Sequence, residues 1–173
     1  MMKAKIIASG LFWLAGLCCA LPAAAEPVAS RKETPVRVVS TLYEDFAWQA
    51  VFAIPAPGTT IADQSRAVLE KYFDSDLASL FVQDAQCRNR TNGVCKLDFD
   101  PIFASQDPSA SDLTLTPSSV SKVAVEFAYS SNREKIRLLY TLKQTAQGWR
   151  ITDIQYANMG NSSLRKILQS KSH

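Results

Sequence analysis

Histidine is almost absent from this sequence, whose one histidine, His173, is the final residue. Serine and cysteine nucleophiles usually need a histidine base, and zinc sites draw most of their ligands from histidine and cysteine. No serine lies in a Gly-x-Ser-x-Gly motif, and the 6 glycines form no phosphate-binding loop. The composition therefore argues against the common hydrolases, zinc enzymes and nucleotide-binding proteins.

An excess of charge of either sign is also missing. Lys and Arg total 19 against 16 Asp and Glu, and the basic residues are scattered along the chain. Nucleic-acid-binding domains usually gather their basic residues on one face. We therefore expect no nucleic-acid partner.

Long apolar runs are confined to the N-terminus. Lys3 and Lys5 precede an apolar run over residues 6–21, which is followed by Pro22 and three alanines. A basic start, an apolar centre and small residues before a cleavage site are typical of a secretory signal peptide. We expect residues 1–25 to be removed, which leaves a periplasmic or secreted protein without a stable membrane span.

Two other uses of this N-terminal segment are less well supported. An uncleaved membrane anchor would need a longer apolar run. A lipid anchor on Cys18 or Cys19 would need a small residue directly before the cysteine, and Cys18 follows Leu17. After cleavage, we expect residues 26–35 to form a flexible lead and residues 36–173 a single domain.

Cysteine is scarce in the mature chain, which keeps only Cys87 and Cys95. An even number of cysteines in an oxidising compartment predicts a disulfide. The two residues bracket the polar segment 88–94, which contains an Asn-Gly turn signal, so we expect a loop closed by the disulfide. A metal pair is the alternative, but the sequence offers no third and fourth ligand of the usual kind.

Amphipathic spacing predicts helices in the first half of the domain. Apolar residues recur at intervals of three and four over residues 36–52. Thr60 or Asp63 can cap a second helix, and Asp74 can cap a third, short one. A short terminal helix is expected over residues 161–170.

Alternating apolar and polar residues predict antiparallel strands in the second half. The strands are expected at residues 112–117, 122–129, 134–144 and 148–156. Short polar connections between them are typical of hairpins.

The last of these strands changes phase. Trp149 and Ile151 lie on one face, whereas Ile154 and Tyr156 lie on the other, which predicts a β-bulge near Thr152 or burial on both faces. A bulge would curve the sheet. Helices followed by antiparallel strands indicate an α+β fold in which N-terminal helices pack on a curved antiparallel sheet.

This layout resembles the nuclear-transport-factor-two-like, or cystatin-like, superfold, in which a curved sheet wraps a helix and leaves a conical pocket. The run LDFDPIF at residues 97–103, with Gln106 and Asp107 after it and GWRITDI at residues 148–154, is similar to the bacterial domain-of-unknown-function family 3828. Members of that family are typically exported or lipoprotein-like and have no assigned activity. The resemblance therefore implies a fold and a compartment, but it supplies no catalytic residues.

Asp98, Asp100 and Asp107 are weak candidates for a metal site, because carboxylates along an extended segment can hold a hard cation such as calcium. The segment lacks the glycine and the distal glutamate of a helix-loop-helix calcium site. Alternatively, Asp100 before Pro101 and Asp107 before Pro108 fix turns by accepting hydrogen bonds from backbone amides. The turn interpretation is favoured, and no metal or other cofactor is expected.

The inner faces of the strands supply candidate ligand contacts. Five apolar or aromatic residues would line the concave face of the sheet: Phe127, Tyr129, Leu138, Tyr140 and Trp149. With no catalytic constellation beside them, we expect a non-enzymatic periplasmic module that binds a small apolar ligand or a protein partner. The alternatives are an isomerase- or dehydratase-like enzyme with a pocket carboxylate and a tyrosine, and an immunity or inhibitor protein.

Overall fold

A computed structural model describes residues 33–51 and 59–170. The expected signal peptide and most of the expected flexible lead lie outside the described residues. In the described part, no helix is long and apolar enough to cross a bilayer.

The first helix, α1 (Pro35–Phe46), begins with a proline after the N-cap residue Thr34. The Thr34 hydroxyl accepts a hydrogen bond from the Arg37 amide at 3.2 Å, which satisfies one free amide of the first turn. The predicted helix over residues 36–52 is too long, because a 3₁₀ turn, η1 (Ala47–Ala50), follows α1. The apolar stripe of α1, which includes Val39 and Leu42, is buried in the core.

The prediction that Thr60 or Asp63 caps the second helix is wrong, because its N-cap is Ser65, and the third helix is longer than predicted. After η2 (Ile61–Asp63), the second is a single turn, α2 (Arg66–Leu69), whereas α3 (Ser75–Thr91) is 17 residues long. Asp74 caps α3 as predicted, since its carboxylate accepts from the Leu77 amide at 2.9 Å.

The expected polar loop between the two cysteines is for the most part helix. Cys87 lies within α3, which ends only at Thr91, and Asn92 closes the helix in the left-handed conformation with φ 50°. An ion pair between Asp84 and Arg88, four residues apart, supports the last turns of the helix. The polar composition of this segment therefore marks a solvent-facing helix end and not a loop.

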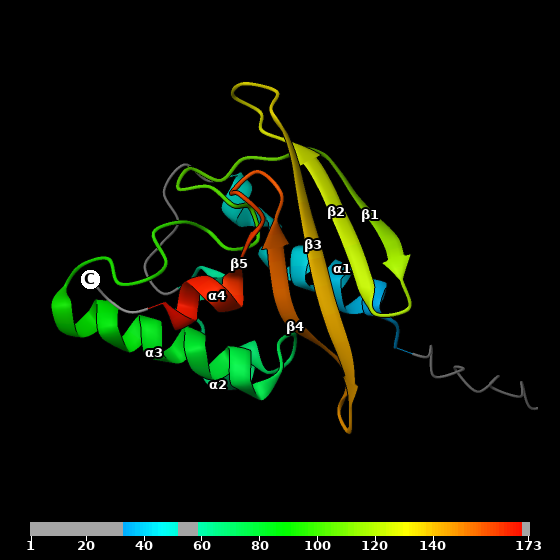
Figure 1. The fold of residues 1–173 in the computed structure, drawn as a ribbon. Coiled ribbons are helices and arrows are strands. Elements are labelled where there is room, and N and C mark those ends of the chain that lie inside the picture. The colour runs from blue at the N-terminus through cyan, green and yellow to red at the C-terminus, as the bar shows by residue number, and fades with distance from the viewer. Residues whose placement is uncertain (1–32, 52–58, 171–173) are drawn as a thin grey trace, which may run out of the picture. The chain divides into compact units, whose positions relative to one another are not determined.

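The second half of the chain forms one antiparallel sheet in the order β1-β2-β3-β4-β5 (Figure 1). Its strands are β1 (Ser111–Ser119), β2 (Lys122–Ala128), β3 (Lys135–Thr145), β4 (Gly148–Tyr156) and β5 (Ser162–Ser163). The α+β class and the four predicted strands are thus confirmed. A terminal helix, α4 (Leu164–Gln169), is present but shorter than predicted.

The predicted bulge lies in β4 at Thr152. Asp153 pairs with Thr141 and Ile151 pairs with Leu142, so Thr152 is the extra residue between them. The bulge lets both Ile151 and Ile154 point into the core despite their odd spacing.

The helices cover one face and one edge of the sheet. Helix α1 contacts β1, β2 and β4, while α3 and α4 lie beside β4 (Figure 1). Beyond the bulge, the free edge of β4 is paired with the chain between α2 and α3: the Asp74 amide donates to the Ile151 carbonyl at 2.9 Å, and the Ile151 amide donates to the Tyr72 carbonyl at 2.8 Å. The opposite face of the sheet carries exposed pairs such as Arg137 and Glu126, 2.6 Å apart.

Candidate functional site

The five predicted ligand contacts lie in or against the core. Phe127, Leu138 and Tyr140 are buried, and Tyr129 and Trp149 are half-buried. The rings of Phe127 and Tyr129 are in contact, with 5.9 Å between their centres. Trp149 instead pairs with Gln144 near the other end of β3. The structure therefore does not gather the five residues into one site.

The side of the sheet that was expected to be concave is occupied by side chains of α1 and of the segment after α3. Tyr43 from α1 lies edge-on to both Tyr140 and Phe103, with ring centres 6.2 and 5.7 Å apart. The Tyr43 and Tyr140 hydroxyls are hydrogen-bonded to each other at 2.9 Å. Phe103 also contacts Phe127, at 5.8 Å between ring centres. The face that was expected to hold a ligand thus forms the aromatic part of the core.

Asp100 begins a tight turn over residues 100–105. Its Oδ1 atom accepts from the amides of Ile102 and Phe103 at 2.9 and 3.2 Å, as the turn interpretation of this residue predicted. Two backbone bonds of 2.8 Å close the turn, from the Asp100 amide to the Ser105 carbonyl and from the Ala104 amide to the Asp100 carbonyl. Ala104 has φ 53°, a left-handed conformation that costs a non-glycine residue about 1 kcal/mol.

Three tyrosines bind successive carbonyls of this turn. Tyr156 of β4 donates to the Pro101 carbonyl at 3.0 Å, and Tyr43 of α1 donates to the Ile102 carbonyl at 2.6 Å. Tyr129, just after β2, donates to the next two carbonyls at 3.1 and 2.8 Å. Helix and sheet together therefore hold the main chain of the turn in place, and we call this arrangement the tyrosine clamp.

The clamp tyrosines are hydrogen-bond donors and not acids at ordinary pH. Burial raises the pKa of Tyr43, of Tyr156 and of the neighbouring Tyr140, because the phenolate form would lose its hydration. Sequence reasoning placed the clamp residue Tyr129 and the neighbouring Tyr140 in a ligand pocket and missed the clamp. No local pattern could have indicated it, since Tyr43 and Ile102 are 59 residues apart.

Beside the turn opens a pocket of about 240 Å³. Its walls come from η2, from Arg88 of α3 and from the segment after the disulfide, and its apolar part includes Leu97, Phe99 and Pro108. Asp98 and Gln106 lie exposed at its rim, with the Gln106 amide 3.5 Å from the Asp98 carboxylate. Five consecutive residues of the LDFDPIF run, 97–101, and Gln106 therefore line one hollow, which we call the Asp100 pocket.

Asp100 is half-buried beside this pocket. One carboxylate oxygen accepts from the two amides of the turn, and the other is open to solvent, since no buried side-chain oxygen among the described residues lacks a partner. Burial raises the pKa of Asp100 to about 6, because the loss of hydration outweighs the two backbone hydrogen bonds. The pocket thus contains a carboxylate that the protein solvates poorly.

Arg88, the basic residue of the pocket wall, is already paired. It binds Asp84, the Asp63 carboxylate at 2.7 Å and the Ala62 carbonyl at 3.1 Å. These partners accept hydrogen bonds from both terminal nitrogens, Nη1 and Nη2, of the guanidinium group. Arg88 therefore braces the wall and does not serve as a counter-ion for Asp100.

The weak metal candidates do not form a metal site. In the part of the chain that the structure describes, no group of three His, Cys, Asp or Glu residues could hold an ion. Asp107 is exposed, and at its turn the contacts are made by the Ser105 hydroxyl, which accepts from the Asp107 amide at 3.1 Å and donates to its carbonyl at 3.0 Å.

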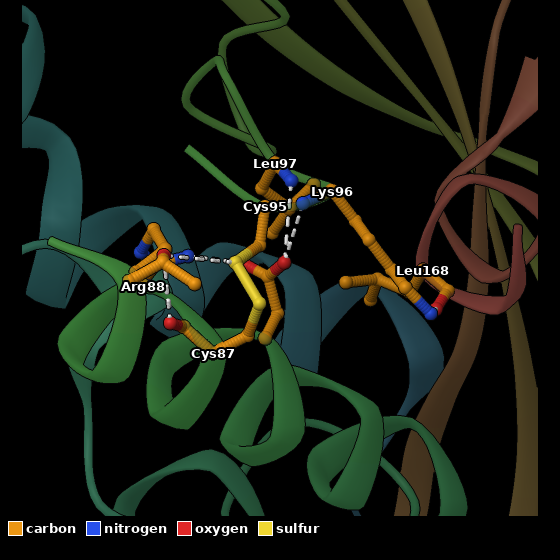
Figure 2. The surroundings of a disulfide bond; sticks show 8 residues. Cys87, Arg88, Cys95, Lys96, Leu97 and Leu168 are labelled. Atoms are coloured by element: carbon orange, nitrogen blue, oxygen red, sulfur yellow. Dashed lines mark hydrogen bonds and ion pairs between the residues drawn. A yellow bond between two sulfur atoms is a disulfide. The ribbon is translucent and has the colours of Figure 1, made fainter. Parts of the chain in front are cut away.

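The predicted disulfide between Cys87 and Cys95 is present, with Cα atoms 6.1 Å apart. Figure 2 shows that it joins α3 to the segment that carries Lys96 and Leu97. The buried carboxylate of Asp84 accepts from the amides of both these residues, at 2.8 and 3.4 Å. The disulfide and Asp84 together fasten one wall of the Asp100 pocket to α3.

A wider hollow of about 600 Å³ lies on the opposite, solvent-facing side of the sheet near the β2–β3 connection. Its charges are mostly paired, Arg137 with Glu126 at 2.6 Å and Arg133 with Asp112 at 3.8 Å. These residues are exposed, so each pair is screened by water. The hollow offers no desolvated group comparable with Asp100.

Comparisons of the chain with protein-family models, with curated proteins and with solved structures gave no match.

Proposed function

We propose that this chain is an exported, non-enzymatic binding module that holds a protein partner at the Asp100 pocket. The resemblance to the domain-of-unknown-function family 3828 supports export and a cone-shaped, nuclear-transport-factor-two-like sheet. The binding site lies at the turn over residues 100–105 and not, as the sequence suggested, on the concave face of the sheet.

The closed concave face supports this location. Tyr43, Phe103 and Tyr140 fill the space that a small apolar ligand would need, and all three are buried. The hydroxyls of Tyr43 and Tyr140 are hydrogen-bonded within the protein, so opening the face would break those bonds as well as expose aromatic surface. A ligand in this position would have to offset both costs.

The observation that carries the proposal is the poorly solvated carboxylate of Asp100 in an open pocket. The tyrosine clamp holds the main chain of the turn that carries this carboxylate, and rigid, preorganised groups bind with little loss of entropy. A pocket of about 240 Å³ is smaller than the usual site of a drug-sized ligand, about 300–1,000 Å³, so it suits one side chain of a larger partner.

A second candidate function, general acid–base catalysis, is favoured by the same raised pKa of about 6 at Asp100. An isomerase or dehydratase of the expected kind also needs a tyrosine donor in the pocket. The nearby hydroxyls of Tyr43 and Tyr156 donate instead to carbonyls of the turn. The missing donor makes binding the better supported function.

Site-specific photo-cross-linking in the native compartment tests the proposal. A photoreactive amino acid replaces Gln106 at the pocket rim or, as a matched control, the exposed Thr116 on the far side of the sheet. We expect one identified protein to be cross-linked from position 106 and also to be retained on the unmodified protein in native mass spectrometry. Equal cross-linking from both positions would contradict the proposed site.

The same mass measurement tests export and the closed face. We expect a mature chain that begins at Glu26 and has no small molecule attached. A tightly retained apolar ligand would return the site to the concave face and overturn the proposal.

A further inference from the structure

We propose that the Asp100 pocket binds an aliphatic cation: the ammonium or guanidinium head and hydrocarbon stem of a lysine or arginine side chain on the partner. The inference rests on the proposed function and names the chemistry of the partner residue.

The charge of the pocket favours a cation. Three carboxylates line it, those of Asp63, Asp98 and Asp100, against the single guanidinium of Arg88. Arg88 is held by Asp63 and by the buried Asp84, and within residues 33–51 and 59–170 no salt bridge reaches Asp100. A cation from outside would supply the missing partner, and a charge-assisted hydrogen bond in a partly desolvated site is stronger than one in water.

The apolar wall favours a cation on a hydrocarbon stem. Leu97 is buried and Phe99 half-buried along one side of the pocket, and Pro108 lies at another. Lysine and arginine side chains bury their methylene stems against such surfaces while the charged head reaches a polar group. The half-buried ring of Phe99 can also lie against a guanidinium group. A hydrated metal ion or a bare ammonium ion would leave this wall unused.

The fixed position of Asp100 favours a single geometry of binding. Its bound oxygen is held by the amides of Ile102 and Phe103, and the tyrosine clamp holds the carbonyls of the same turn. With one oxygen bound and the turn held, the carboxylate has little freedom to rotate. The site is formed before a ligand arrives, which suits recognition of one side chain.

The test uses capped amino acids as probes, followed by amide NMR spectra of the full mature protein. The N-acetyl N-methylamide forms of lysine and arginine are titrated beside that of norleucine, which has a similar stem without the charge. We expect saturable shifts at the amides of residues 97–103 with the cations, of millimolar affinity, and at least tenfold weaker binding of norleucine.

Variants of acidic residues locate the interaction. Asp100→Asn keeps an oxygen for the two turn amides but removes the charge, so we expect about tenfold weaker lysine binding with a preserved spectrum. Asp112→Asn, at an exposed position on the far side of the sheet, is the matched control and should bind as the parent does. If Asp100→Asn does not fold, Asp98→Asn at the rim replaces it, with a several-fold loss expected.

The pH dependence gives a readout without mutation. Binding of the lysine probe should weaken about tenfold between pH 7.5 and pH 5, as Asp100 takes up a proton. The charged groups that line the pocket with it are Asp63 of η2, Asp98 of the same segment and Arg88 of α3, and burial raises the pKa of the tyrosines behind the turn, Tyr43 and Tyr156, so these stay neutral. Binding that does not change with pH, or that the norleucine probe matches, would overturn the inference.

A final arm separates a partner side chain from a free amine. Putrescine carries the same ammonium group without a polypeptide, and stronger binding of putrescine than of the lysine probe would contradict a protein residue as the source. If a partner is cross-linked at the pocket but no cationic probe binds, this inference fails while the proposed function stands. If the cations bind but no partner is found, the proposed function fails while the cation preference of the pocket stands.

Discussion

Single hydroxyl groups decide the position of the Asp100 turn. The Tyr43 and Tyr156 hydroxyls satisfy carbonyls that the core hides from water. A buried carbonyl without a partner costs about 1–3 kcal/mol, whereas a carbonyl within reach of water finds a substitute. The clamp therefore contributes to stability mainly at its two buried bonds.

Removing each hydroxyl tests this division. We expect Tyr43→Phe and Tyr156→Phe to lower the free energy of unfolding by about 1–3 kcal/mol, with Tyr43→Phe the larger because Tyr140 also loses its partner. Tyr129→Phe, at the half-buried position, should cost less. Urea denaturation of the three variants measures the order, and equal losses would contradict a role for burial.

Asp100 makes the stability of the fold depend on pH. Its pKa is about 6 in the folded state against 3.8 for an ordinary carboxyl group, so the folded protein binds the proton more tightly than the unfolded chain. This contribution is complete below about pH 4 and is lost as the pH rises through about 6. The shift corresponds to at most about 3 kcal/mol.

Comparing the parent with Asp100→Asn isolates this contribution. We expect the parent to lose stability relative to the variant between pH 4 and pH 7, in denaturant titrations at closely spaced pH values. Asp107→Asn, an exposed change in the same segment, should leave the pH profile unchanged. A constant difference between parent and Asp100→Asn across this range would show that the carboxyl is well solvated.

At the scale of elements, the end of α3 and the pocket wall act as one piece. The disulfide closes a ring between residues 87 and 95, and Asp84 binds the two amides that follow it. A ring of this size constrains the unfolded chain by about 2–3 kcal/mol in the loop-entropy model. We expect the hydrogen bonds of Asp84 to hold this segment in part when the disulfide is removed.

A double variant, Cys87→Ser with Cys95→Ser, should therefore fold but lose about 2–3 kcal/mol of stability. Amide hydrogen exchange should accelerate at Lys96 and Leu97, while the strands of the sheet keep their protection relative to global unfolding. The parent in its reduced form is the matched control. Unchanged exchange at the two amides would mean that Asp84 alone holds the wall.

The elements also show how far the sequence could be interpreted. Alternation predicted four strands, and the phase change between Ile151 and Ile154 predicted the bulge, because strand periodicity depends only on neighbours. The last turns of α3 were missed, because polar residues at an exposed helix end have the composition of a loop. At the site, Asp100 was predicted to fix a turn, but the tyrosine clamp joins segments whose contact follows from tertiary packing alone.

At the scale of the whole molecule, Asp74 joins three elements. Its buried carboxylate caps α3 through the Leu77 amide and pairs with Lys143 of β3 at 2.8 Å and with Arg165, in α4, at 3.1 Å. Burying this carboxylate is tolerated because each of its oxygens has a partner.

Two substitutions separate the cap from the ion pairs. Asp74→Asn keeps a good N-cap and loses the charge, so we expect a loss of about 1–2 kcal/mol, whereas Asp74→Ala loses both and should cost about 3–5 kcal/mol. Thermal and urea denaturation measure the two losses. Both variants keep the main-chain hydrogen bond from the Asp74 amide to β4, so the difference between them reports the side chain. Equal losses would assign the whole effect to the ion pairs and none of it to the cap.

The tyrosine clamp recognises main-chain oxygens and makes no demand on the side chains at the pocket rim. Residues such as Asp98 and Gln106 could therefore be exchanged while the turn kept its shape. In a scaffold of this kind, the residues that fix the main chain of the turn differ from the residues that contact a partner. Its specificity could be changed, by natural drift or by engineering, without rebuilding the protein beneath it.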